Sequence, residues 1–195
     1  MLNKKQARLL SFFIGSSGYL VPRPYNEYVK ISKTMHPFIL GKRNIHYFYN
    51  LEKSLYGIRA TMEVFKNIVA TEGKILFISN SFPLHRRFGK EPDINCIKWK
   101  RGTLAKSKEA DLVFLDGVEK ENLVEAHRKC LLLVGVGSCT MSKVSYPFNL
   151  NIESPLLSDW FFGSIYTSYL QGKKKKNKKS PINSLLGKGP LKNEI

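Results

Sequence analysis

The clearest hydrophobic pattern in the chain begins just after residue 50. Apolar side chains recur there at alternating spacings of four and three, which is typical of one face of an amphipathic helix. They are Leu51, Leu55, Ile58, Met62, Phe65 and Val69. Asn50 is a suitable N-cap and Gly73 a suitable stop. We therefore predict a helix over about 51–69, and we expect its apolar face to pack into a core rather than to bind a partner.

Short, continuous apolar runs follow this helix. Four of them lie at Lys74–Ser79, Ile94–Trp99, Asp111–Asp116 and Leu131–Gly137. A strand that is buried on both faces has this uninterrupted apolar character, as strands in a parallel sheet do. We predict four strands here, separated by polar links at 80–93 and 101–110.

Two further helices are predicted between and after these strands. One spans Glu119–Lys129, with Leu123, Val124 and Ala126 facing inward, and the other spans Leu156–Leu170. Strands that alternate with helices indicate a parallel sheet covered on both faces. We predict one three-layer α/β domain within residues 1–172, with its folded part at about 8–170. Hydrophobic periodicity ends at Gln171, and residues 173–195 read as a Lys-rich, disordered tail.

The charge of the chain calls for a polyanionic partner. Its 195 residues include 32 Lys and Arg against 15 Asp and Glu, a formal net charge of +17. Residues 173–195 hold eight Lys and one Glu, so +7 lies in the tail and +10 on residues 1–172. The predicted folded body is therefore basic in its own right. Nucleic acid and an anionic membrane surface are the usual partners of such a field.

Candidate chemistry is sparse. The three cysteines form no C-x-x-C pair, the four histidines are scattered, and no metal site is predicted. Gly135 and Gly137 follow the last strand as the first two glycines of a dinucleotide fingerprint would, but Thr140 stands at the third position. A nucleotide-binding α/β enzyme that uses these glycines is the alternative hypothesis, with Asp116 at a strand end as a further candidate residue. We predict no catalytic residue and no cofactor.

Six short segments, in collinear order over about residues 9–170, resemble motifs of one known family. Met35–His46 is similar to its pattern M-x-P-[YF]-I-[FY]-G-x-R-N-x-I-H, and Ala110–Asp116 to P-D-L-[LV]-[FIV]-[VI]-x-D. The other segments are Asn50–Ser54, Trp99–Leu104, Glu125–Ala126, and Leu133–Cys139 together with Tyr146–Pro147. The family is the small-subunit ribosomal protein S-2 family, of bacterial and organellar type. Each motif is modest alone, and their order makes the resemblance specific.

The resemblance implies a flavodoxin-like three-layer fold, no reaction and no nucleotide. It implies a structural protein that binds ribosomal RNA of the small subunit and neighbouring ribosomal proteins, with no membrane and no small-molecule substrate. The chain departs from the family in places. It lacks the long helical hairpin after the G-T-L segment, Arg101 replaces a glycine, and the turn P-G-N-D reads Asn149-Leu-Asn151-Ile.

The expected mode of RNA binding is neutralisation of phosphates by cations on loops, with shape rather than sequence being recognised. Any one of these cations can equally be a solvated surface charge, and Trp99 and Tyr47 can stack on a base or pack in the core. The candidate contacts are Lys42, Arg43, Arg86, Arg87, Lys98, Lys100, Arg101, Lys106, Lys108, Lys173, Lys174, Lys175, Lys176, Lys178 and Lys179.

Residue usage favours an organellar compartment. Lys outnumbers Arg by 24 to 8, which fits translation from an AT-rich genome. Residues 1–20 are basic and free of acids, as a targeting signal would be, but Arg8–Gly15 aligns with the first helix of the family. We expect a mitochondrial small ribosomal subunit, ahead of a plastid or bacterial one. A basic peripheral membrane protein with a polybasic tail is a third hypothesis.

Overall fold

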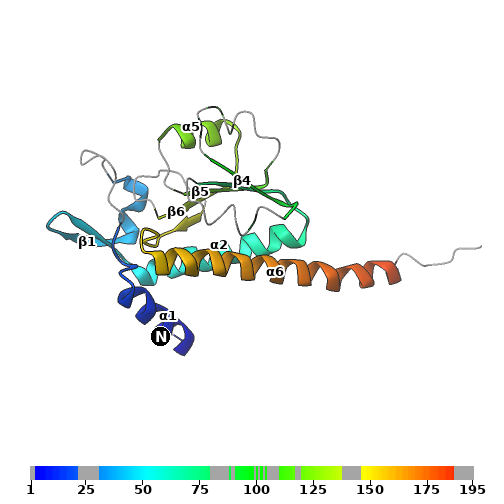
Figure 1. The fold of residues 1–195 in the computed structure, drawn as a ribbon, viewed down its shortest axis with the longest axis horizontal. Coiled ribbons are helices and arrows are strands. Elements are labelled where there is room, and N and C mark those ends of the chain that lie inside the picture. The colour runs from blue at the N-terminus through cyan, green and yellow to red at the C-terminus, as the bar shows by residue number, and fades with distance from the viewer. Residues whose placement is uncertain are drawn as a thin grey trace, which may run out of the picture.

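The protein is a three-layer α/β structure, with a parallel sheet between two layers of helices (Figure 1). The computed structural model describes residues 3–21, 31–79, 88, 91–98, 100, 102, 104, 110–116, 120–137 and 146–186, and for 120–123 and 177–186 it describes the backbone alone. The predicted fold class is confirmed. Most residues of the predicted links at 80–93 and 101–110 lie outside the described residues.

The central sheet has five parallel strands in the order β4-β3-β5-β6-β7. Counted along the chain without the separate hairpin, this is the order 2-1-3-4-5 of flavodoxin-like folds. The strands are β3 (Ile75–Ile78), β4 (Ile94–Ile97), β5 (Leu112–Asp116), β6 (Leu133–Val136) and β7 (Tyr146–Phe148). The first four confirm the predicted strands. Strand β7 was not predicted, because it has three residues and its middle one is Pro147, which an edge strand tolerates.

Helices α2 (Leu51–Ala70) and α6 (Pro155–Leu186) cover one face of the sheet, and α5 (Lys120–Arg128) covers the other (Figure 1). Helix α2 begins as predicted, since the side chain of Asn50 accepts a hydrogen bond from the backbone N–H of Lys53 at 3.3 Å. Helix α1 (Lys4–Gly15) packs on α6, where the ring of Phe13 meets that of Trp160 edge-on at 5.0 Å.

The core consists of two clusters, one on each face of the sheet. The larger lies under α2 and α6, where the ring of Phe114 stacks on Phe77 at 4.4 Å and meets Phe65 edge-on at 5.6 Å. The smaller lies under α5 and includes Ala126, which is fully buried as predicted. Val124 was predicted to face inward but is 49% exposed, because the short α5 buries only a narrow stripe. The side chain of Leu123 lies outside the described residues.

A second element that was not predicted precedes α2. It is a two-stranded antiparallel hairpin of β1 (Ile39–Arg43) and β2 (His46–Tyr49), which follows the 3-10 helix η1 (Lys33–Phe38). Asn44 in its turn has φ of 55°, a left-handed conformation that asparagine accepts more readily than most residues. Figure 1 shows the hairpin projecting from the end of the molecule opposite to the tip of α6.

Helix α6 does not end at residue 172, where the Lys-rich tail was predicted to begin, but continues through the Lys run to Leu186; residues 187–195 lie outside the described residues. The continuation packs against the body. Gly172 allows close approach to α2, since an added Cβ would lie 2.8 Å from the backbone oxygen of Lys66 and from Val69 Cβ. Lys175 Nζ donates to Asn67 Oδ1 at 2.9 Å, and Lys176 pairs with Glu72 at 2.8 Å. Polar contacts thus continue the helix where its hydrophobic periodicity stops.

Candidate nucleic-acid interface

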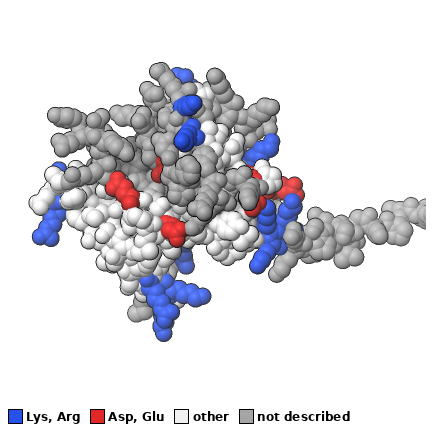
Figure 2. All heavy atoms as spheres, in the orientation of Figure 1, with Lys and Arg blue, Asp and Glu red and all other residues white. Residues whose placement is uncertain are grey.

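Positive charge is concentrated at the two ends of the chain. Residues 1–51 contain eight Lys and Arg and a single acid, Glu27, which gives +7. Residues 52–172 contain 16 Lys and Arg against 13 Asp and Glu, which gives only +3, and residues 173–195 give +7. Figure 2 shows the consequence, with Lys and Arg side chains in separate groups at the left, lower and right edges of the molecule. The basic surface is therefore not one patch.

The hairpin carries the first group. Lys42 lies opposite Tyr47 in the β1–β2 pairing, and Arg43 lies opposite His46. Adjacent residues of a strand point to opposite faces, so the two cations serve both faces of the hairpin. Both are exposed, and among the described residues neither forms an ion pair. The ammonium of Lys42 lies 5.3 Å from the centre of the Tyr47 ring, a cation–π distance that supports the side chain and leaves its charge in solvent.

The base of the hairpin is held firmly, although its tip is exposed. Tyr49 is 2% exposed, and its backbone N–H donates to the carbonyl of Tyr19 at 2.7 Å. The ring of Phe48 stacks on that of Tyr19 at 5.7 Å. Leu40, at the irregularity near the base, is 73% exposed, and Ile45, in the turn, is 63% exposed. The hairpin therefore presents cations and apolar side chains together, on a rigid base.

The second group lies on α6, and the structure divides it. Lys173 Nζ pairs with Glu91 Oε2 at 2.8 Å and lies 4.5 Å from the centre of the Tyr169 ring. The hydroxyl of Tyr169 also donates to Glu91 Oε2, at 2.7 Å. The hydrogen bonds from Lys173 and Tyr169 lower the pKa of Glu91, and burial raises the pKa of Tyr169 to about 12. Lys173 thus holds α6 to the body.

The remaining lysines of this run differ in their surroundings. Lys175 and Lys176 contact α2 and the turn after it, as described above, and their side chains stay exposed. Lys174 is exposed and forms no ion pair among the described residues. Lys178 and Lys179 belong to α6, and their side chains lie outside the described residues.

The other predicted contacts lie near the carboxyl end of β4 or outside the described part of the chain. Lys98 and Lys100 are exposed and directly follow β4, an edge strand of the sheet. Five candidates lie outside the described residues: Arg86, Arg87, Arg101, Lys106 and Lys108. Trp99 also lies outside them, and Tyr47 is partly buried against the larger core cluster.

Several residues of the family-like motifs hold segments of the fold together. The backbone N–H of Gly102 donates to Glu125 Oε1 at 2.7 Å, which joins two of the motifs. The backbone N–H of Lys74 donates to Asp111 Oδ2 at 2.8 Å, at the start of β3. Asn151 donates to the carbonyl of Ser17 at 3.3 Å. These side chains therefore have structural partners, which motif matching alone did not identify.

The candidate residues of the nucleotide hypothesis also have structural partners. Gly137 has φ of 64°, and an added Cβ there would lie 2.8 Å from Ile152 Cγ1 and 3.0 Å from the carbonyl oxygen of Leu150. Packing thus explains this glycine. Asp116 Oδ2 accepts a hydrogen bond from the Ser79 hydroxyl at 2.6 Å, and burial raises the pKa of Asp116. The hydrogen bond between Ser79 and Asp116 thus joins the carboxyl ends of β3 and β5.

No protein-family model matches the chain, and no curated protein matches its sequence. Within the described residues, no group of three His, Cys, Asp or Glu side chains could hold a metal ion. No helix in the same part of the chain is both long and apolar enough to cross a membrane.

Proposed function

We propose that this protein is an RNA-binding structural component of the small ribosomal subunit, of the mitochondrial ribosome in particular, and that it is not an enzyme. Its partners are small-subunit ribosomal RNA and neighbouring ribosomal proteins. The observation that carries the proposal is the exposed, acid-free cationic hairpin at one end of the molecule, with a second cationic element, α6, at the other (Figure 1). Two separated cationic elements suit an extended polyanion better than a small ligand.

The family resemblance supports the ribosomal part of the proposal. The flavodoxin-like strand order agrees with the fold that the resemblance implies. The bond between Gly102 and Glu125 gives a structural reason for two of the resembling segments. RNA binding rests on the charge distribution, and assignment to the ribosome rests on the resemblance.

The mechanism of binding is phosphate neutralisation. A-form RNA displays phosphates and 2′-hydroxyls across a wide, shallow minor groove, so projecting cations can dock without reading bases. Lys42 and Arg43 occupy opposite faces of the hairpin and can therefore contact two backbone strands. Lys174 and the lysines after it provide a second point of attachment on α6. Each neutralised phosphate releases counterions and makes the affinity salt-dependent.

The RNA-binding part is tested with a small-subunit ribosomal RNA transcript in filter binding across a salt series. Lys42→Gln and Arg43→Gln are each expected to reduce the slope of log affinity against log salt by about 0.7–0.9, the value of one lost phosphate contact. Arg128→Gln is the matched control, because Arg128 is an exposed cation on α5, which covers the face of the sheet opposite to α2 and α6 and is not part of the hairpin. Equal slopes for all three variants, or binding that is independent of salt, would refute the hairpin as an RNA contact.

The ribosomal part is tested separately by sedimentation of the native protein through a gradient at moderate salt. The protein is expected to migrate with the small subunit. Free protein at the top of the gradient would contradict the ribosomal assignment, while leaving the result with the transcript intact.

A further inference from the structure

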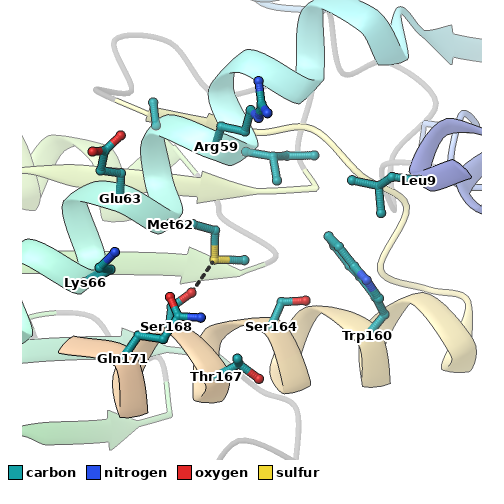
Figure 3. Close-up of a pocket in the computed structure, with 12 residues that line it drawn as sticks. Leu9, Arg59, Met62, Glu63, Lys66, Trp160, Ser164, Thr167, Ser168 and Gln171 are labelled. Atoms are coloured by element: carbon teal, nitrogen blue, oxygen red, sulfur yellow. Dashed lines mark hydrogen bonds between the residues drawn. The ribbon is translucent and has the colours of Figure 1, made fainter. Parts of the chain in front are cut away.

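A groove of about 1030 Å³ runs between α1, α2 and α6, on the side of the helical layer that faces away from the sheet (Figure 3). Its floor is apolar and includes Leu9, Ile58, Met62 and Trp160. Figure 3 shows Trp160 rising from α6 toward Leu9, and Met62 pointing from α2 toward Ser168. The RNA-binding proposal uses none of these residues.

The floor of the groove is preorganised. Trp160 is partly exposed, and its ring is held edge-on against the buried Phe13 at 5.0 Å. Ile58 is only 4% exposed and closes the bottom of the groove. A fixed tryptophan beside a flexible methionine is typical of a surface that receives apolar side chains from a protein partner.

The wall formed by α6 consists of polar side chains, most of which are small. Ser164, Thr167, Ser168 and Gln171 line it, and small side chains on three of these positions let another backbone approach closely. Thr167 donates to the carbonyl of Gly163 at 2.8 Å, and Ser168 donates to the sulfur of Met62 at 3.4 Å. The wall from position 160 to 171 is about 16 Å long, which corresponds to three turns of an α-helix.

The charge around the groove is strongly positive. Up to Lys176, the three bounding helices carry ten Lys and Arg against three Asp and Glu, and two of these cations, Lys173 and Lys176, pair with acids outside the helices, which leaves a net charge of +5. On the groove itself, α2 contributes Arg59 and Lys66 against Glu63. Among the described residues, none of these three forms an ion pair shorter than 4.0 Å. An occupant must therefore bring negative charge.

We propose that the groove binds an amphipathic α-helix of a second protein, with an apolar face on the floor and acidic residues along its edges. Helix-in-groove recognition uses apolar anchors at i, i+3, i+4 and i+7, which match a floor of this length. Leu9, Ile58 and Met62 offer RNA neither charge nor hydrogen bonds, and of the floor residues only Trp160 could stack on a base, so an RNA strand would leave most of the floor uncovered. An amphipathic protein helix can cover the apolar floor with its apolar face and pair its acidic residues with the cations of the rim.

The test uses the full-length protein and a labelled synthetic helix of about 18 residues, long enough to form helix in water. The peptide has leucines at the four anchor positions and glutamates elsewhere on its surface. Fluorescence anisotropy is expected to show saturable binding, which is lost when the glutamates are replaced by lysines. Arg59→Glu is expected to weaken binding at least about tenfold, since it reverses a charge on the rim. Lys53→Glu is the matched control on the same helix, outside the groove, and is expected to change the affinity less than about threefold.

Four results would overturn the proposal. The first is no binding of the acidic peptide by a protein whose thermal unfolding is normal. The second is displacement of the peptide by a short oligouridylate, which would make the groove an RNA site. The third is self-association of the protein in sedimentation equilibrium that Arg59→Glu abolishes, which would make a second copy of this chain the occupant. Binding by Arg59→Glu that equals binding by Lys53→Glu would also overturn it, because the peptide would then bind elsewhere.

Discussion

The packing of α6 against α2 predicts an unusual outcome for Gly172→Ala. In an exposed helix interior, replacing glycine by alanine stabilises by about 1 kcal/mol. At position 172 the new Cβ would lie 2.8 Å from three atoms of α2, namely the backbone oxygen of Lys66 and the Cβ and Cγ1 of Val69. Ordinary contacts begin at about 3.4 Å, and neither a backbone oxygen nor a Cβ can rotate away.

The magnitude follows from these opposing effects. Relieving the overlap requires α6 to shift by more than half an ångström, and overpacking of this kind costs about 1–3 kcal/mol. The shift also disturbs the ion pair between Lys173 and Glu91, which contributes up to about 1 kcal/mol as a partly exposed pair. The gain in helix propensity on replacing glycine by alanine offsets only part of this loss of stability. We expect a net loss of stability of about 1–2 kcal/mol.

Thermal unfolding followed by circular dichroism measures the effect, with Gly15→Ala as the matched control. Gly15 is also helical, and a Cβ there would meet nothing within 4 Å, so this variant is expected to be neutral or to gain up to about 1 kcal/mol. The two variants should differ in stability by about 1–3 kcal/mol, which for a chain of this size is a difference in Tm of roughly 2–12 °C. Equal Tm values would show that α6 does not dock on α2 beyond Leu170, and would refute the ordered continuation of the helix.

Three further predictions follow from the charged groups and the end of the chain. Hydrogen bonds from Lys173 and Tyr169 lower the pKa of Glu91, so its stabilisation is present above about pH 4.5 and lost as pH falls below that. Glu91→Gln should therefore lower Tm by roughly 2–4 °C at pH 7, and the difference from the wild type should shrink as the pH falls below 4.5; a difference that stays constant at acid pH would contradict this. Burial raises the pKa of Asp116, so ionisation of this carboxyl opposes folding, and Asp116→Asn should raise Tm more at pH 8 than at acid pH; a variant less stable than the wild type at pH 8 would contradict this. Removing residues 173–195 should lower both RNA affinity and Tm, whereas removing residues 187–195 should leave Tm unchanged; unchanged Tm in both would mean that the lysine contacts to α2 contribute nothing.

The sheet was predictable because burial on both faces leaves a mark in the sequence. Strands β3, β5 and β6 are buried along nearly their whole length, so each appears as a continuous apolar run. The hairpin leaves no such mark, since β1 is exposed from Leu40 to Arg43 and the turn at Asn44 lacks the Asn-Gly signal. Strand β7 has only three residues, which are too few to show a hydrophobic pattern.

The candidate interface was predictable only in part. Residue type and local charge were enough to predict that Lys42 and Arg43 are exposed cations, although both lie in strand β1 rather than in a loop. Residue type and local charge could not predict that Lys173 forms an ion pair and Lys174 does not. The partner of Lys173 is Glu91, which is 82 residues away in sequence. The groove was equally hidden, since Leu9, Met62 and Trp160 come from three distant segments that only the packed helices bring together.

The position of α6 in the chain has a consequence for the biosynthesis of the protein. The larger core cluster is closed by four side chains of α6 that are each at most 2% exposed, and all four follow the five strands in the chain: Phe161, Phe162, Ile165 and Tyr169. A nascent chain that ends before Pro155 has all five strands and α2 but lacks the helix that shields them. Such a chain exposes a broad apolar surface, and this is the situation in which chaperones are needed. The core of this domain can therefore close only after α6 has followed the five strands out of the ribosome.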